Sequence, residues 1–571
     1  MKRTTLFLAG TALAAGLNAQ VVTNELWTAT AAPVLTLSEV DEIQNPTYVA
    51  ENGDAFVSGR FTDPFTFNGQ EYEAIATSAF LKKYSVTGAE EWAITMQGSA
   101  KITQITEGAD GTIYVAGMLA DEVVFTSTDG STLTDKGYVN TAGEPVASFD
   151  ASFIAAYNQD GKLLYEKVYK AEVTSYYPTD AAGDVTFTVT KIQENAGNLY
   201  VAAIVKGNFS QNGVTLPGSS YEADFFPGLF LGNQPQAAIF QLSDDLNVQN
   251  ITASLTEKTP TVMQQYSVAD IDFTIDEGTL RMALITAGTK NLFIAGQTVP
   301  VDFGLVDGDL VYGHIITSNQ LGSSEYQAET FSAVDGIFPK TNIKDMQVNE
   351  GKLFVAGVFS SNLAFDNALE AVGGSDLFVT QFDASTLAPQ SSYASMYNEG
   401  DKNYFAETCQ GIAFAGESVI VKGFSFQDQN NIETPLKGIV LELDTKVGTA
   451  TFSEASALTA GLSSNGDKVL ETNVSLNEGL VQQTYILSEV EGSTGIEDVV
   501  NGAEVTVFPT RTNNVINLSQ AADVAIFDLT GALVLEQANV TVVSVADLLP
   551  GNYILRVSTQ AGTQVVKIIK Q

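Results

Sequence analysis

Cysteine and histidine are almost absent from this chain. Its 571 residues include one cysteine, Cys409, and one histidine, His314. A lone cysteine cannot form an intrachain disulfide, a redox pair or a multi-cysteine metal site. One imidazole cannot supply a zinc site with several histidines, and a Ser-His-Asp triad would need His314 as its base. Both residues lie in strand-like segments, so we expect Cys409 to be a small core residue and His314 a core or surface strand residue rather than a catalyst.

Basic residues are scarce as well. The chain has 27 lysines and arginines against 67 aspartates and glutamates, for a formal net charge of -40. A charge of this sign repels polyanions, so nucleic acid and anionic membrane surfaces are poor partners. We interpret the charge mainly as a solvated acidic surface, which would also attract divalent cations.

Motifs for nucleotides and for calcium are missing. The chain has no Walker loop, no Gly-x-Gly-x-x-Gly that opens a helix, no EF-hand spacing and no calcium-binding nonapeptide. Aspartates do recur in oxygen-rich connections: Asp302, Asp307 and Asp309 in one, and Asp63, Asp121 and Asp366 in three others. We attribute them to turns and predict no cofactor, with Ca²⁺ in these loops as the alternative.

Apolar runs of membrane-spanning length are also missing. The chain opens with Lys2 and Arg3, followed by a short apolar stretch from Leu6 to Gly16. This pattern is typical of a secretory signal peptide and is too short for a membrane span. We predict a signal peptide at residues 1–19, cleaved after Ala19, no transmembrane segment, and a route through the periplasm.

The chain repeats one short sequence motif, a glycine turn followed by a strand, such as Gly-Thr-Ile-Tyr-Val-Ala-Gly. We call this motif the glycine phrase. Its seven copies begin at Gly53, Gly111, Gly197, Gly278, Gly351, Gly416 and Gly466. Each follows an apolar stretch and precedes two further strand patterns, which gives four strands a unit. Four strands at spacings of 50 to 86 residues predict the blades of a β-propeller. The fourth unit, from Gly278, looks degraded.

The two ends of the repeat array complement each other. The last unit has strand patterns at 468–472 and 484–488 and then runs out. Asn-Glu-Leu-Trp-Thr-Ala-Thr at 24–30 is similar to Glu-Glu-Trp-Ala-Ile-Thr at 90–95, a fourth strand of the first unit. An N-terminal strand that completes the last blade would close the ring and protect its sheet edges. We therefore predict an all-β fold with a seven-bladed β-propeller over residues 20–490, whose last blade is closed by the N-terminal strand.

These phrases resemble the bacterial β-propeller repeats often called SBBP. The matching phrases are Tyr-Val-Ala-Gly, then Ala-Phe-Leu-Lys-Lys-Tyr at 79–84 or Leu-Phe-Val-Thr-Gln-Phe at 377–382, then a turn. The resemblance covers roughly residues 21 to 490. It implies the propeller fold and no particular enzymatic activity.

After Gly492 the repeating pattern of four strands ends. Residues 491–498 are predicted to be a linker, and residues 499–571 a compact module of six or seven short strands, which predicts a small Ig-like β-sandwich. The module is similar to the type A C-terminal sorting domain of the type IX secretion system of Bacteroidota. The residues that carry this resemblance are Pro509, Asp528, Gly531, Pro550, Gly551, Tyr553, Lys567 and Lys570. Thr510 and Arg511 replace the Asn-Pro that usually follows the first proline. The resemblance implies handling by that secretion machinery, export across the outer membrane, and release or attachment at the cell surface. An Ig-like binding domain is the alternative.

One insertion stands out between the second and third strands of the third unit. It reads Tyr-Glu-Ala-Asp-Phe-Phe-Pro-Gly-Leu-Phe-Leu, and its candidate binding residues are Tyr221, Phe225, Phe226 and Phe230. An aromatic loop on a rigid scaffold could stack on sugars or dock a protein, although it could equally fold back as a plug.

Three functions stay open at the level of sequence. We favour a secreted or cell-surface, non-enzymatic scaffold that binds a glycan or a protein. The first alternative is a carboxylate-based glycosidase or lyase in the central channel, which should converge carboxylates, arginine and tyrosine at one face of the axis. The second alternative is a structural surface protein. The sequence identifies no catalytic or metal-binding residue.

Overall fold

The computed structural model describes the strands and turns of most of the chain. The described residues are 23–30, 35–36, 45–138, 151–172, 185–222, 230–255, 267–332 (without 288–290, 295–296, 301–304, 307–308, 311 and 324), 342–395 (without 361, 367 and 373), 405–490 (without 416–417, 430–431, 446–448 and 478–479) and 505–570 (without 506, 509–510, 528–532, 547, 550 and 560–561). The chain divides into two compact units, Met1–Val490 and Glu491–Gln571. The predicted signal peptide and the predicted linker at 491–498 lie outside the described residues.

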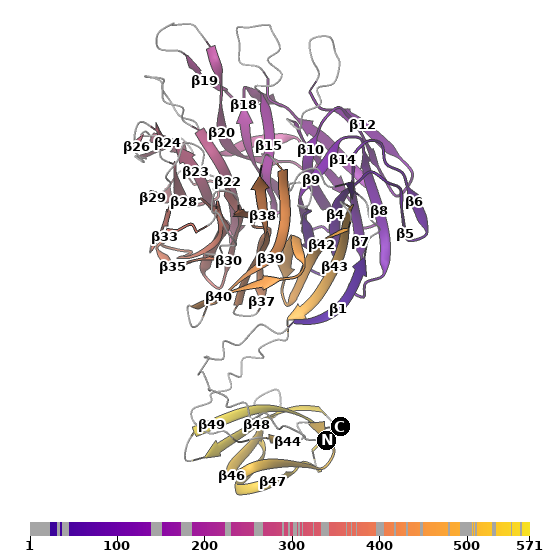
Figure 1. The fold of residues 1–571 in the computed structure, drawn as a ribbon, viewed down its shortest axis with the longest axis vertical. Helices are drawn as coiled ribbons and strands as arrows, with labels where there is room; N and C mark the ends of the chain where they lie inside the picture. The colour runs from indigo at the N-terminus through magenta and orange to yellow at the C-terminus, as the bar shows by residue number, and fades with distance from the viewer. Residues whose placement is uncertain are drawn as a thin grey trace, which may run out of the picture. The chain divides into compact units, whose positions relative to one another are not determined.

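In the first unit, seven antiparallel sheets follow one another along the described part of the chain, each with four main strands (Figure 1). The first sheet holds β3 (Thr47–Val49), β4 (Ala55–Phe61), β7 (Ser78–Tyr84) and β8 (Glu90–Gln97). The second holds β9 (Ala100–Glu107), β10 (Ile113–Leu119), β13 (Ala151–Tyr157) and β14 (Leu163–Tyr169). The third holds β15 (Thr186–Asn195), β16 (Asn198–Lys206), β20 (Phe230–Leu242) and β21 (Val248–Leu255).

The next four sheets repeat this order. The fourth holds β22 (Ser267–Asp276), β23 (Thr279–Ala287), β28 (Tyr312–Gln320) and β29 (Tyr326–Ser332). The fifth holds β30 (Asn342–Asn349), β31 (Lys352–Phe359), β34 (Asp376–Asp383) and β35 (Pro389–Ala394). The sixth holds β37 (Gly411–Ala415), β38 (Ser418–Gln429), β39 (Ile432–Asp444) and β40 (Thr449–Ala455). The seventh holds β41 (Leu458–Asn465), β42 (Lys468–Asn477), β43 (Leu480–Val490) and, from the other end of the chain, β1 (Thr23–Thr30).

Short strands decorate these sheets, mostly between their second and third strands. They are β2 (Leu35–Thr36), β5 (Phe65–Phe67), β6 (Gln70–Tyr72), β11 (Glu122–Thr126), β12 (Thr132–Lys136), β17 (Phe209–Gln211), β18 (Val214–Leu216), β19 (Ser219–Glu222), β24 (Asn291–Ile294), β25 (Gln297–Pro300), β26 (Leu305–Val306), β27 (Asp309–Leu310), β32 (Asn362–Ala364), β33 (Ala368–Glu370) and β36 (Phe405–Glu407). The hairpin of β11 and β12 comes from the second sheet but pairs with β8, so it extends the first sheet to six strands.

The glycine of the repeated phrase lies in the turn between the first and second strands of a sheet. Gly53, Gly111 and Gly351 have φ angles of +85°, +81° and +73°. Residues with a side chain rarely adopt this backbone conformation, so the turn depends on glycine. The phrase therefore predicts the position of the first hairpin correctly.

The first strands of the seven sheets contact one another in a circle. β3 lies against β9, β9 against β15, β15 against β22, β22 against β30, β30 against β37, β37 against β41, and β41 against β3. Between the seventh and first sheets, the Asn45 backbone N–H donates to the Ala460 carbonyl at 2.8 Å. The Asn465 side chain donates to the Val49 carbonyl at 3.2 Å. Strands from opposite ends of the array are thus joined directly.

The N-terminal strand completes the seventh sheet, as the sequence predicts. β1 pairs antiparallel with β43, and Figure 1 shows the two side by side in indigo and orange. Trp27 of β1 is buried, and its ring lies 5.2 Å from that of Tyr84 in the first sheet. Trp92 of β8 occupies the matching place one sheet later, because each tryptophan packs on the turn glycine of the next sheet, Gly88 and Gly161.

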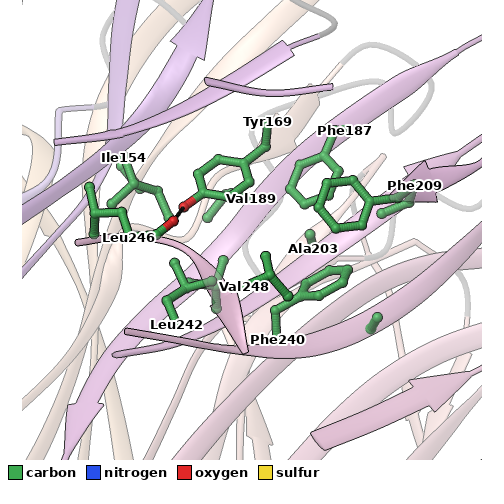
Figure 2. Packing of buried hydrophobic residues seen from close by; sticks show 14 of the residues in the cluster. Ile154, Tyr169, Phe187, Val189, Ala203, Phe209, Phe240, Leu242, Leu246 and Val248 are labelled. Atoms are coloured by element: carbon green, nitrogen blue, oxygen red, sulfur yellow. Dashed lines mark hydrogen bonds between the residues drawn. The ribbon is translucent and has the colours of Figure 1, made fainter. Parts of the chain in front are cut away.

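The space between neighbouring sheets is filled by apolar side chains. Figure 2 shows the cluster between the second and third sheets, where Tyr169, Phe187, Phe209 and Phe240 pack closely. Their ring centroids lie 4.9 to 5.6 Å apart in the paired contacts. The Tyr169 hydroxyl donates to the Leu246 carbonyl at 2.7 Å, which satisfies the one polar atom that this ring buries.

The burial of Cys409 and His314 and the form of the fourth repeat can be compared with the predictions from sequence. Cys409 and His314 are 4% and 1% exposed, so both are core residues. Burial lowers the pKa of His314 to about 4, and its ring lies 5.2 Å from Phe365. The fourth repeat, although degraded in sequence, still forms a sheet of four strands. The repeat departs from the phrase in sequence, with Leu-Arg-Met-Ala in β23, but keeps the apolar alternation that forms a strand.

The described strands of the second unit form one hydrogen-bonded sheet of six strands. Its strands are β44 (Val507–Phe508), β45 (Arg511–Thr512), β46 (Val515–Phe527), β47 (Leu533–Ser544), β48 (Gly551–Thr559) and β49 (Gly562–Lys570). β46 pairs with β44, β47 and β48, while β45 joins β49 in parallel. Ile516, Ile526, Val543 and Leu555 are buried in its core.

Candidate functional site

A cavity of about 500 Å³ lies where the first strands meet. We call it the central cavity. Its wall is formed by residues of β3, β9, β15, β22, β30 and β41 together with Asn45, Pro46 and Gln410. The polar side chains among its lining residues are Asn45, Thr47, Tyr48, Lys101, Thr103, Gln104, Thr106, Glu107, Lys191, Gln193, Glu194, Thr274, Asp276, Lys344, Asp345, Gln347, Gln410, Ser463 and Ser464. A volume of this size is typical of sites for small ligands.

Bulges in the first strands shape this wall. In β9, β15, β22, β30 and β41 the pairing with the second strand skips one residue. The skipped residues are Thr103, Thr190, Ala269, Lys344 and Ala460. A bulge bends a strand and re-aims its side chains. Equivalent positions in successive repeats therefore present different side chains to the cavity wall, while the strand order of the sheets stays the same.

A buried charge cluster joins three sheets at the cavity wall. The Lys191 ammonium of β15 lies 2.7 Å from an Asp345 oxygen of β30 and 3.8 Å from Asp272 of β22. Burial disfavours the charge on Lys191, but the two carboxylates outweigh it and raise the pKa of the ammonium. Lys191 thus reaches two sheets onward and ties the third, fourth and fifth sheets together.

Asp345 is the most fully satisfied carboxylate of this cluster. Besides Lys191, it accepts from the Ile412 backbone N–H at 3.0 Å and from the Gln347 side chain at 2.7 Å. Burial opposes its ionisation, yet Lys191 and these donors hold its pKa below the usual range. Asp345 is therefore a permanent anion that anchors the sixth sheet to the fifth.

Two further aspartates in β22 behave in the opposite way. Burial raises the pKa of Asp272 to about 8, with Asp345 and Asp270 adding to the effect and Lys191 opposing it. Burial also raises the pKa of Asp270 to about 7, although the Ile343 backbone N–H donates to it at 2.8 Å. Neither carboxyl is among the groups that line the cavity. They hold protons near neutrality behind its wall.

Glutamates at the far ends of the first strands hold neighbouring sheets together. Glu107 of β9 accepts from the Gln159 side chain at 2.8 Å and from the Glu51 backbone N–H at 3.4 Å. Glu194 of β15 accepts from the Ala109 backbone N–H at 3.2 Å. These carboxylates line the cavity but already serve as acceptors for protein donors.

The candidate binding loop lies mostly outside the described residues. Phe225 and Phe226 are among those not described, and the side chains of Tyr221 and Phe230 are not described either. Their backbones lie in β19 and at the start of β20, where Tyr221 pairs with Gly232 and Glu222 with Phe230. The backbones of Tyr221 and Phe230 thus lie in the two paired strands of a hairpin.

The sorting-motif residues fall in the second unit. Gly551, Tyr553, Lys567 and Lys570 lie in β48 and β49, where Gly551 pairs with Lys570 and Ile554 with Lys567. Tyr553 is 9% exposed, and its hydroxyl donates to the Leu549 carbonyl at 2.8 Å. The remaining motif residues, Pro509, Asp528, Gly531 and Pro550, lie outside the described residues.

The aspartates considered for Ca²⁺ do not form a site where the structure describes them. Asp63 and Asp366 are exposed, and Asp121 occupies a turn with φ of +59°. Within the described part of the chain, no three His, Cys, Asp or Glu side chains gather as a metal ion would need. The side chains of Asp302, Asp307 and Asp309 are outside it.

The sequence alone did not single out the central cavity. Its polar residues come from all seven repeats, between one and five from each, at positions just before the glycine phrase. Relative to the bulge residue of its strand, Lys101 lies two positions before, Lys191 one position after, and Lys344 at the bulge itself. Because the positions differ, no repeat alignment would have singled these lysines out.

Comparison with known proteins identifies the end of the chain. Residues 506–571 match the family described as the secretion system C-terminal sorting domain. This confirms the type IX sorting domain predicted from the motif, and it makes the protein one that the type IX machinery handles, for secretion or cell-surface display. No curated protein matches the chain. Within the described residues, no helix has the length and apolar character needed to cross a membrane.

Solved structures with propeller-like folds are similar to the chain at low identity. The polysaccharide lyase Uly1 is 10% identical with a TM-score of 0.43, covering 82% of this chain and 100% of the lyase. The Dos1 propeller is 8% identical with a TM-score of 0.37, covering 81% and 96%. The Trypanosoma rangeli sialidase in complex with the inhibitor DANA is 7% identical with a TM-score of 0.34, covering 89% of each chain. At these TM-scores the likenesses carry no argument about activity.

Proposed function

We propose that this protein is a secreted or surface-attached β-propeller that binds a glycan or a protein in its central cavity and performs no catalysis. In this proposal the seven sheets are the blades of an SBBP-type propeller, closed by β1. The circle of contacts between first strands and the pairing of β1 with β43 support it. The second unit is its Ig-like sorting sandwich. An N-terminal signal, passage through the periplasm and outer membrane, and a Bacteroidota source complete the proposal.

The observation that carries the binding function is the central cavity itself. Its wall offers amides, hydroxyls and ammonium groups from six first strands. Its carboxylates are engaged with protein donors, as Asp345, Glu107 and Glu194 show. A catalytic acid needs to be presented to substrate, whereas these groups are committed to holding sheets together.

A catalytic role is the second candidate because of Asp270 and Asp272. Carboxyl groups with pKa values near 7 and 8 are protonated at the pH at which a general acid must work. Against this, both lie behind the cavity wall, no arginine lines it, and the one histidine is buried beside Phe365 and Phe378. Binding is therefore the better supported proposal.

A binding screen tests the proposal directly. The purified full chain is titrated with a panel of glycans and secreted proteins, with and without Ca²⁺, and each mixture is also assayed for cleavage. We expect at least one ligand to bind and to be recovered unchanged. Hydrolysis or elimination of any polysaccharide would support the catalytic candidate instead, and silence across the whole panel would reject the binding function.

The sorting function has its own test. Removing residues 495–571 should leave the first unit inside the cell, because the sorting domain is what the secretion machinery handles. The measurement is the fraction of protein in the medium or at the surface of the native host, detected with an antibody to the first unit. Continued secretion of the truncated chain would contradict the assignment.

A further inference from the structure

A second cavity lies between the first and second sheets and shares no lining residue with the central cavity. We call it the side cavity. Its volume is about 480 Å³, within the range of sites for small ligands. Two added segments, the β5–β6 hairpin and the turn that joins β11 to β12, meet there with β7, β8 and the turn after β13. The lining residues are Phe67, Asn68, Gln70, Tyr72, Lys83, Glu91, Trp92, Thr128, Gln159 and Asp160.

The edges of the side cavity are held in place by hydrogen bonds within the protein. The Tyr72 hydroxyl of the β5–β6 hairpin donates to the Ala93 carbonyl of β8 at 3.0 Å. The Thr128 hydroxyl donates to the Asp160 carbonyl at 2.8 Å, which joins the β11–β12 turn to the β13–β14 turn. The cavity is therefore formed in the protein alone, so binding does not require these segments to become ordered first.

Three of the lining residues already use their donors within the protein. The Lys83 ammonium lies 2.9 Å from an Asp54 oxygen and 3.0 Å from a Glu91 oxygen. It also donates to the Gln159 side-chain oxygen at 3.1 Å. The Trp92 indole N–H donates to the Gln159 carbonyl at 2.8 Å. These groups give the cavity its shape, and the hydrogen bonds to a ligand have to come from other side chains.

Two polar side chains at the side cavity are not engaged in this way. Gln70 and Asp160 are exposed, and neither side chain has a hydrogen-bond or ion-pair partner among the described residues. The Gln70 amide both donates and accepts, and the Asp160 carboxylate accepts from several donors. The rings of Phe67, Tyr72 and Trp92 form the apolar part of the lining. This combination matches a sugar ring, which has hydroxyl groups at its edge and C–H groups on its faces.

The local charge favours a neutral sugar over a charged ligand. Asp54 and Glu91 together outweigh the single charge of Lys83, and Asp160 adds a further negative charge. An anionic ligand is therefore repelled here, as it is by the chain as a whole with its net charge of -40. A cation gains little in return, because ion pairs with an exposed carboxylate such as Asp160 are weak in water.

We propose that the side cavity binds one neutral pyranose unit of a glycan, whose hydroxyls are hydrogen-bonded by Gln70 and Asp160 and whose C–H face lies against the aromatic part of the lining. This site is additional to the proposed site in the central cavity and uses none of its residues. The observation that carries it is that one preformed cavity brings together aromatic rings and two unengaged polar side chains.

The test follows the tryptophan fluorescence of the full chain during titration with the methyl glycosides of glucose, galactose, mannose and N-acetylglucosamine, and with methyl glucuronide. Trp92 lines the side cavity, and the only other tryptophan, Trp27, packs on Gly88 at a different interface. We expect at least one neutral glycoside to change the fluorescence with a Kd of about 1 mM, and methyl glucuronide to bind at least about fivefold more weakly. Gln70→Ala and Asp160→Ala should each weaken the neutral glycoside by about fivefold.

Glu71→Ala is the matched control, because Glu71 is exposed in the same hairpin, carries the same charge as Asp160 and does not line the cavity. It should not change affinity, and thermal unfolding of all three variants should match that of the parent. Calorimetry repeats each titration, so that binding without a fluorescence change is also detected.

Binding that survives both cavity variants, tighter binding of methyl glucuronide, or no binding of any neutral glycoside would overturn this inference. Binding of arginine amide but of no glycoside would overturn it too and assign the cavity to a cation. A ligand of the central cavity should not respond to Gln70→Ala or Asp160→Ala, so each of these outcomes leaves the proposed function standing.

Discussion

Glu407 illustrates how a single buried carboxyl sets the response of this fold to pH. It lies between the fifth and sixth sheets, is 4% exposed, and accepts from the Leu377 backbone N–H at 2.7 Å and from the Ser395 hydroxyl. Its other oxygen has no hydrogen-bond partner among the described residues. Burial raises its pKa to about 8, and the nearby Asp376 adds to the rise. Near neutral pH it is mostly protonated.

The substitution Glu407→Gln should flatten the pH dependence of stability. A carboxyl whose pKa is about 8 in the folded state and about 4.3 in the unfolded chain stabilises the fold fully below the lower value, and that stability is lost as pH rises to about 8. Glutamine keeps the shape and does not ionise. We expect the two proteins to be alike at pH 5 and the variant to be more stable by about 2–4 kcal/mol at pH 8.

Urea unfolding at several pH values measures this difference. Both tryptophans of the chain, Trp27 and Trp92, lie in the first unit, so their fluorescence follows that unit alone. Glu325→Gln, at an exposed position, is the control and should not alter the slope. An unchanged slope in the Glu407 variant would show that this carboxyl is ionised in the folded protein.

At the scale of single residues, the sequence predicted which side chains are buried but not which side chains pair with each other. Cys409 is buried as expected for a small apolar residue, although the expected strand is wrong there, because Cys409 lies in the connection between β36 and β37. The role of Lys191 does not, because Asp272 and Asp345 are brought to it from two later repeats. No local pattern marks such a pair before the sheets are arranged.

At the scale of single elements, the turn between the third and fourth strands positions the tryptophan of the preceding sheet. A Cβ atom built on Gly88 would lie 2.7 Å from Trp27, and one on Gly161 would lie 2.7 Å from Trp92. Both glycines also have positive φ angles, +80° and +77°. The same contact between a tryptophan and a turn glycine therefore occurs between the seventh and first sheets and between the first and second sheets.

Gly88→Ala should destabilise the first unit more than Gly69→Ala. Both positions have positive φ, +80° and +74°, so each alanine costs about 1–2 kcal/mol in the backbone. Only at Gly88 does the new methyl also displace a buried ring, which adds about 1–3 kcal/mol, since nothing lies within 4 Å of a Cβ on Gly69. Urea midpoints with tryptophan fluorescence compare them, and equal losses would mean that Trp27 does not rest on this turn.

The main strands of the sheets were easier to predict than the added hairpins and the bulges. The glycine phrase located the first hairpin of most sheets because positive φ angles leave few alternatives to glycine. The pairing of the β11–β12 hairpin with β8 of another sheet was not predicted, because it depends on how two sheets lie together. The bulges that shape the central cavity were missed for a related reason, since one skipped residue leaves the apolar alternation nearly intact.

At the scale of the whole molecule, charge is divided unevenly along the chain. Residues 506–571 hold four basic and four acidic residues, so the net charge of -40 belongs to the rest of the chain. The sorting domain is thus electrically neutral, and the acidic character belongs to the unit that it exports. This division fits a tail that is handled by the secretion machinery and an acidic first unit that is exported with it.

The proposed propeller is closed in two places, where the first strands β3 and β41 meet and where β1 completes the last sheet by pairing with β43. Hydrogen exchange of the native full chain, followed by mass spectrometry over residues 23–30, measures this pairing. Because β1 is hydrogen-bonded to β43 in one sheet, its bonded amides should exchange at least about a hundredfold more slowly than unstructured ones, with the protection of an edge strand. Exchange of residues 23–30 at the unprotected rate, while β41, β42 and β43 remain protected, would contradict the proposed completion of the last blade by the N-terminal strand.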